Sequence, residues 1–261
     1  MKHYYSHYSF DLTSRKWYDI CGGGDISAQY NTVFDATYVE TDNIRSVRTT
    51  ETSNCRMNIP ADFLPQNSDD NSGNYTIVVV SRHIQGNAPR LIQSMDSNWL
   101  FPYHGNGTGT HFDGAFVNVN TDYSNNWLVS VLKREKQEDN SYNKTIYTLG
   151  IEKTNNTQKE VSNELLDISF NDDPPVDLAI NSGLVHPELG QFDIGEIISY
   201  HSALTDASIS IIQNTFYQRY YGEGTSGSGD NIPTLELKTG STYTFDTFND
   251  GFSIYDNNDI S

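Results

Sequence analysis

Cysteine is scarce in this sequence, which has two cysteines among 261 residues. Cys21 and Cys55 are too few for a disulfide framework or for a four-cysteine zinc site. They can pair with each other, or each can serve as a small buried hydrophobic residue, which is the arrangement we expect. A chain of this length buries enough apolar surface to fold without a metal or a disulfide.

Basic residues are also few, with 16 Lys and Arg against 34 Asp and Glu and a formal net charge of −18. Binding to a nucleic-acid backbone needs clustered Lys and Arg, and so does a polybasic contact with a membrane surface. The charge therefore argues against both classes of partner. Carboxylate oxygens are ligands that Ca²⁺ prefers, so calcium stays open as a cofactor, without assigned ligand residues.

Long apolar runs are absent, so no segment approaches the length that spans a membrane. Met1–Phe10 lacks the pattern of a signal peptide. We expect a protein that acts outside the cell or on the surface of a virion, without membrane insertion. Either its leader is missing from this sequence, or it reaches the exterior by another route such as assembly into a particle.

The chain shows strand patterns through most of its length. Tyr75–Val80 is the most hydrophobic stretch and predicts a fully buried strand. Phe192–Tyr200, rich in Ile and aromatic residues, predicts another strand. His3 and His7, four residues apart, could hold a metal on a helix, but this aromatic run favours an edge strand with both residues at its surface.

One helix is predicted after Phe192–Tyr200. Thr205 or Asp206 can cap its first turn, and Gly222 can end it in the left-handed conformation. Apolar residues three or four positions apart form one stripe, namely Ile209, Ile212, Phe216 and Tyr220. We expect this stripe to cover the end or edge of a β-sandwich.

Three stretches of the sequence resemble laminin-G-like domains, which belong to the concanavalin A-like group of jelly-roll sandwiches. Trp17–Gly22 is similar to the Trp-x-Asp-x-Ser-Gly opening of that family, with Cys21 in the usual serine position. Asp193–Tyr200, followed by Leu204–Asp206 and Tyr220–Gly222, is similar to its closing strand and helix. The resemblance implies an antiparallel jelly-roll β-sandwich with one C-terminal amphipathic helix. The resemblance also covers a central hairpin between Tyr75 and Gly105 and the later strand that contains Trp127. This chain departs from the family at Gly150, where the family usually has an Asn-Gly turn.

The predicted organisation has three parts. Residues 1–222 form the laminin-G-like sandwich, and residues 223–231 form a Gly/Ser linker. Residues 232–261 carry two short strands, and about thirty residues cannot bury an independent core. This tail is either the start of a truncated second domain or an arm that docks on another subunit.

No residue pattern in the sequence supports catalysis. Sandwich glycanases carry two Glu and one Asp in a tight series on one strand, whereas Glu164 and Asp167 are three apart and Phe170 replaces the second Glu. His104 and His111 could form an acid/base pair, but no nucleophile accompanies them. We therefore expect no enzyme, with a polysaccharide hydrolase or lyase as third choice.

The stretch from Asp96 to Phe116 combines aromatic residues, amides and four glycines. Sugar rings have apolar faces edged by hydroxyls, so a glycan site needs an aromatic platform beside short polar side chains. The candidate ligands are Trp99, Tyr103, His104, Asn106, His111 and Asp113. Strand alternation places Trp99, Phe101 and Tyr103 on one face, which can equally be the buried one. Tyr103, His104, Asn106 and His111 are the members we expect to be exposed.

Two function classes remain open. The first is a carbohydrate-binding or adhesive surface module whose partner is a glycan or cell-surface polysaccharide, with other subunits of a particle as further partners. The alternative is a purely structural capsid or fibre module without glycan binding.

Overall fold

The computed structural model describes the chain except for residues 29–36, 42–43, 52–55, 67–72, 87–88, 106, 114–115, 121–126, 139–141, 152–157, 168–173, 183–187, 222–233, 239–240, 249–250 and 257–261. The predicted linker, Asn106 and Cys55 lie among these exceptions. The chain forms two compact units, Met1–Ala203 and Leu204–Ser261. The predicted domain boundary at Gly222 stays a prediction.

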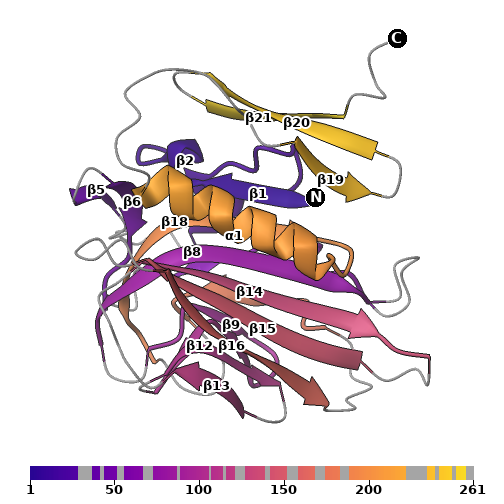
Figure 1. Cartoon of the computed structure of the whole chain (residues 1–261). Helices are drawn as coiled ribbons and strands as arrows, with labels where there is room; N and C mark the ends of the chain where they lie inside the picture. The colour runs from indigo at the N-terminus through magenta and orange to yellow at the C-terminus, as the bar shows by residue number, and fades with distance from the viewer. Residues whose placement is uncertain are drawn as a thin grey trace. The chain divides into compact units, whose positions relative to one another are not determined.

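The first unit is an antiparallel β-sandwich of two sheets (Figure 1). Its eight-stranded sheet, here called sheet A, has the order β16-β15-β14-β8-β18-β6-β5 among the described residues, and β1 also pairs with β18. The strands of sheet A are β1 (His3–Ser6), β5 (Thr37–Thr41), β6 (Ile44–Arg48), β8 (Tyr75–Gln85), β14 (Trp127–Lys136), β15 (Tyr142–Ile151), β16 (Gln158–Asp167) and β18 (Gln191–Tyr200).

The second sheet, sheet B, contains ten described strands in the order β11-β12-β10-β9-β17-β7-β4-β3-β2, and β13 also pairs with β12. Its strands are β2 (Phe10–Asp11), β3 (Lys16–Trp17), β4 (Ile26–Ala28), β7 (Met57–Asn58), β9 (Ile92–Ser94), β10 (Trp99–Phe101), β11 (Tyr103–His104), β12 (Gly107–Asp113), β13 (Phe116–Asn120) and β17 (Leu178–Ile180). A 3-10 turn, η1 (His7–Ser9), follows β1.

The core is filled by alternate residues of the strands. On β8, Tyr75, Ile77 and Val79 belong to the main buried cluster, whereas Val78 and Val80 are buried outside it. A strand apolar on both faces indicates burial on both sides. The prediction of a fully buried strand at Tyr75–Val80 is therefore confirmed.

The second unit contains the α-helix α1 (Asp206–Tyr221) and a three-stranded sheet. Thr205 caps the helix, because its Oγ1 accepts the Ser208 N–H at 3.2 Å. Ile209, Ile212 and Phe216 of the predicted stripe are buried, and the side chain of Tyr220 lies outside the described part. The helix and its cap are confirmed, and the surface that the stripe covers stays a prediction.

The tail contains one strand more than the sequence indicated. Its antiparallel sheet consists of β19 (Thr234–Lys238), β20 (Ser241–Phe248) and β21 (Gly251–Asp256). Within the described ranges, no helix is long and apolar enough to cross a membrane. The expected sandwich, C-terminal helix and β tail are thus all present.

Candidate functional site

The predicted glycan stretch forms four neighbouring strands at one end of sheet B, β10 to β13. Trp99, Phe101 and Tyr103 are at most 1% exposed and belong to the core between the sheets. The aromatic side chains therefore alternate inward, which was the competing interpretation of this stretch. An inward ring on a two-sheet sandwich packs on the other sheet, so it offers no platform for a sugar.

Tyr103 was expected to be exposed, and this was wrong. Its hydroxyl lies 3.1 Å from Ser81 Oγ and 3.2 Å from the Ser81 carbonyl oxygen, which ties β11 to β8 across the core. Burial raises the pKa of Tyr103, so its hydroxyl stays protonated and can donate to Ser81.

His111 was also expected to be exposed, and it is 1% exposed. Its Nδ1 donates to the Leu100 carbonyl oxygen at 2.9 Å, and its ring packs edge-on against Trp99 with centroids 5.3 Å apart. Burial, reinforced by the nearby Lys144 ammonium, lowers the pKa of His111 to about 4. His111 is therefore a neutral core histidine at pH 7.

Asp113 is half-buried, and its carboxylate accepts a hydrogen bond from the buried Lys144 ammonium. Asn106 lies outside the described residues. Of the six predicted ligands, His104 and Asp113 are thus the two that the structure places partly at the surface.

A connected polar group surrounds His104, and we call it the Arg90 cluster: Arg90, Asn98, His104 and Glu188. The Arg90 guanidinium donates from Nε to Glu188 Oε2 and from Nη1 to Asn98 Oδ1, the latter at 3.0 Å. His104 Nε2 lies 3.4 Å from the same Glu188 oxygen. The cluster brings together residues before β9, before β10, at the end of β11 and before β18.

The backbone around Glu188 is fixed by its neighbours. The Arg90 N–H donates to the Glu188 carbonyl oxygen at 3.1 Å. The Gly190 N–H donates to Asn181 Oδ1 at 2.9 Å, and Thr49 Oγ1 donates to the Gly190 carbonyl oxygen at 3.2 Å. A carboxylate on a segment held in this way has little freedom left to lose when a ligand binds.

His104 is half-buried, with a side chain that is 23% exposed. Burial lowers the pKa of His104, the Arg90 charge lowers it further, and the Glu188 carboxylate opposes both effects. At pH 7 the imidazole is therefore neutral, so one ring nitrogen donates and the other accepts.

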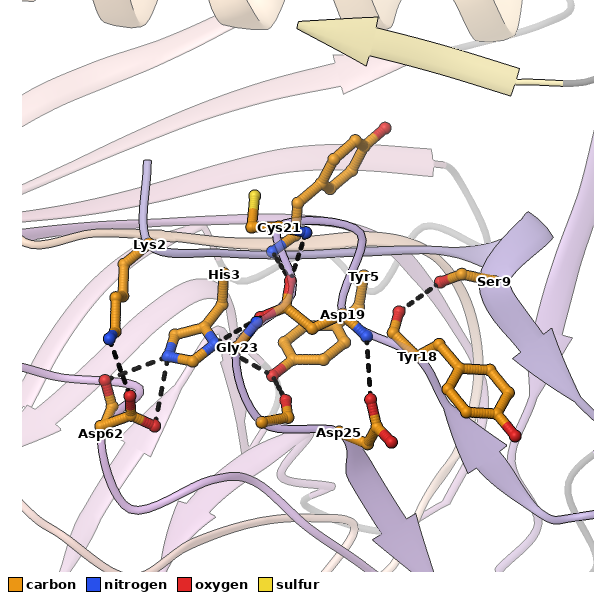
Figure 2. Close-up of polar contacts among 12 residues, drawn as sticks. Lys2, His3, Tyr5, Ser9, Tyr18, Asp19, Cys21, Gly23, Asp25 and Asp62 are labelled. Carbon is orange, nitrogen blue, oxygen red and sulfur yellow. Dashed lines mark hydrogen bonds and ion pairs between the residues drawn. The ribbon is translucent and has the colours of Figure 1, made fainter.

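A second polar group lies at the N-terminal strand (Figure 2). His3 Nδ1 is 2.7 Å from Asp19 Oδ2, and His3 Nε2 is 3.1 Å from the Asp62 carbonyl oxygen. Asp19 also accepts the N–H groups of Tyr4, Cys21 and Gly23 at 2.9–3.0 Å. All the hydrogen-bonding capacity of the Asp19 carboxylate is thus directed into the fold, which indicates a structural role for this group.

Two expectations about this region were wrong. His3, on β1 where that strand pairs with β18, and His7, in η1, are both buried. Cys21 was expected to be buried and is exposed, since it stands on the loop that turns at Gly22 with φ +76°. Its N–H, rather than its thiol, contacts Asp19.

Within the described part of the chain, no group of three or more His, Cys, Asp or Glu side chains is placed to hold a metal ion.

The two sheets define a β-sandwich domain, and comparison with solved structures gives the same class. The fold is similar to the binding domain of Paraclostridial Mosquitocidal Protein 1, with a TM-score of 0.55, 12% identity, and coverage of 99% of this chain and 68% of that one. It is similar to the binding domain of botulinum neurotoxin serotype G, with a TM-score of 0.53, 15% identity, and coverage of 98% and 64%. A Trypanosoma rangeli sialidase aligns with a TM-score of 0.50 and 12% identity over 83% and 32% of the chains.

The chain spans about two thirds of the length of the two binding domains and about a third of the sialidase. Identities this low show a shared fold and do not transfer a function. No family model and no curated protein sequence matches the chain.

Sequence reasoning missed Glu188 altogether. It follows a stretch without strand or helix pattern, and 98 positions separate it from Arg90. The available signal was Arg90 itself, because an arginine directly before an apolar strand needs a carboxylate partner if it is buried. That signal does not identify which of the 34 acidic residues serves.

Proposed function

We propose that this chain is a non-catalytic, concanavalin A-like carbohydrate-binding module that acts outside the cell or on the surface of a particle. The observation that carries the proposal is the Arg90 cluster, where a carboxylate, an amide and a neutral imidazole meet and each is at least partly exposed. The proposed partner is a glycan or cell-surface polysaccharide.

The chemistry of the cluster suits sugar hydroxyls. A hydroxyl both donates and accepts, and the cluster offers acceptors on Glu188 and Asn98 and donors on the Asn98 amide, beside the imidazole of His104. The Arg90 side chain is 7% exposed, and its hydrogen bonds hold the side chains of Glu188 and Asn98 in place. Precise placement of a few polar groups is what gives a small-molecule site its specificity.

The same cluster argues for binding rather than hydrolysis. Glycoside hydrolysis by the common mechanisms uses two carboxyl groups on opposite sides of the scissile bond. Glu188 is the single carboxylate of the cluster, and one of its oxygens is already bound to Arg90. The fold likeness to two domains named as binding domains supports this interpretation.

The test is a glycan array with the wild-type chain and the double variant His104→Ala/Asn98→Ala. We expect the double variant to lose binding to the glycans that the wild type retains and to keep a cooperative melting transition, at a lower temperature because the buried Arg90 loses its Asn98 acceptor. His201→Ala is the matched control, because His201 is a half-buried histidine whose Nε2 contacts the Asp62 carbonyl oxygen, outside the cluster.

Two results would count against the proposal. If the wild type bound no glycan on a broad array, the structural class of capsid or fibre module would be favoured. If the double variant bound as tightly as the wild type, the site would lie elsewhere on the molecule.

A further inference from the structure

We propose that the Arg90 cluster selects uncharged glycans and rejects sialylated or sulfated ones. This inference rests on the proposed function, and it concerns the charge of the ligand at the same site. The expected selectivity depends on two properties of the charged groups: which of them are exposed to solvent, and which already have a partner within the protein.

The single cation of the cluster is not available to a ligand. Recognition of a carboxylate or sulfate uses an arginine fork or a lysine that can contact the anion. The Arg90 side chain is 7% exposed, and its Nε and Nη1 already donate to Glu188 and Asn98. An acidic sugar would have to compete with Glu188 for a buried partner.

Among the described residues in and beside the cluster, the partly exposed groups are negative or neutral. The Glu188 side chain is 23% exposed. Asp96 is exposed on the β9–β10 turn, two residues before Asn98, and its Oδ1 accepts the Ser94 hydroxyl. His104 adds no positive charge at pH 7, because the pKa of His104 is lowered by burial and by Arg90. A ligand anion therefore meets the Glu188 carboxylate of the cluster, with Asp96 exposed two residues before Asn98, while the one cation of the cluster is buried.

The charge of the whole chain acts in the same direction. A formal net charge of −18 repels anions at distances beyond direct contact, although salt screens this effect. Juxtaposed like charges suppress wrong partners strongly, so we expect the acidic form of a glycan to bind about 10-fold or more weakly than its neutral form.

The experiment measures binding of the full chain to an array of hexose-terminated glycans, each printed beside its sialylated and its sulfated form. The wild type should prefer the neutral member of each pair by about 10-fold or more. In 1 M NaCl, where the Debye length falls to about 3 Å, the preference should shrink.

Two charge variants test the cause. Glu188→Gln keeps the shape of the side chain and an acceptor for Arg90 but removes the negative charge, so it should narrow the preference for neutral glycans. Asp96→Asn removes an exposed charge that takes no part in the Arg90 hydrogen bonds. It should reduce the preference for neutral glycans by less than Glu188→Gln does. It also keeps the test decisive if Glu188→Gln fails to fold.

The outcomes separate this inference from the proposed function. Equal binding to neutral and acidic forms, or preference for the acidic ones, overturns the inference and leaves the glycan-binding function standing. A preference that neither variant nor salt changes overturns it as well, because the discrimination would then be steric. Absence of binding to every glycan overturns the proposed function itself.

Discussion

At the scale of single residues, the N-terminal polar group explains a sequence feature that the family resemblance only named. The aspartate of the Trp-x-Asp stretch is Asp19, and it accepts hydrogen bonds from His3 and from three backbone N–H groups. The glycines that follow let the loop approach this carboxylate closely. At Gly24, an added Cβ would lie 2.8 Å from Pro60. Gly23 and Gly24 therefore reflect close packing, whereas Gly22 supplies the positive φ of the turn.

Gly23→Ala tests this packing directly. A Cβ at Gly23 would lie 2.4 Å from Asp19 Oδ2 and 2.7 Å from the His3 ring, so the loop must shift and the bonds to Asp19 must lengthen. We expect a loss of about 2–3 kcal/mol in the free energy of unfolding, measured by urea denaturation.

Gly22→Ala is the control. It has open space around the added Cβ but a φ of +76°, and it should cost about 1 kcal/mol. Equal costs for the two variants would contradict the packing argument.

At the scale of elements, the sequence predicted best what depends on local pattern. The helix follows from residues three and four apart and from Thr205, so α1 and its cap were predictable. The same holds for β8 and β18, whose compositions indicate buried strands. Which face of the strands β10 to β12 is buried could not be predicted in this way. Alternation says that Trp99, Phe101 and Tyr103 share a face, but only the opposite sheet decides that this face is the core.

Phe216→Ala tests the helix. Phe216 is 6% exposed, and truncating a buried aromatic side chain to Ala costs about 3–5 kcal/mol, which should appear as a lowered melting temperature and urea midpoint. Ile211→Ala on the same helix is the control, because Ile211 is 38% exposed and should change stability little. If Phe216→Ala kept the wild-type melting temperature, the predicted apolar stripe would not be a stabilising contact.

At the scale of the whole molecule, the fold class could be predicted and the site largely could not. The strand patterns and the one terminal helix predicted a β-rich chain, and the resemblance to laminin-G-like domains implied the sandwich. The Arg90 cluster depends on a different kind of information. It joins Arg90 to Glu188 across 98 positions, and such a pairing appears only once the strands have been placed.

Buried histidines make the stability of the whole fold depend on pH. Burial lowers the pKa values of four of them, His83, His104, His111 and His201. A histidine whose folded-state pKa lies below its ordinary value of 6.5 binds fewer protons when folded than when unfolded, so stability rises with pH. The stabilisation is fully present above about pH 6.5 and is lost as the pH falls toward about 4, the folded-state pKa of His111.

His111 alone should contribute about 2 kcal/mol to the loss of stability between pH 7 and pH 5, because its pKa falls from 6.5 to about 4. The measurement is the free energy of urea unfolding at several pH values for the wild type and for His111→Gln. The variant loses the hydrogen bond to Leu100 or weakens it, so it should be less stable at pH 7. It has no imidazole to protonate, however, so its stability should fall less steeply toward pH 5.

His201→Gln is the comparison for a half-buried histidine. It should change the pH dependence of the unfolding free energy by less than His111→Gln does. If the wild type and His111→Gln lost the same free energy between pH 7 and pH 5, the buried imidazole would not be the source of acid sensitivity.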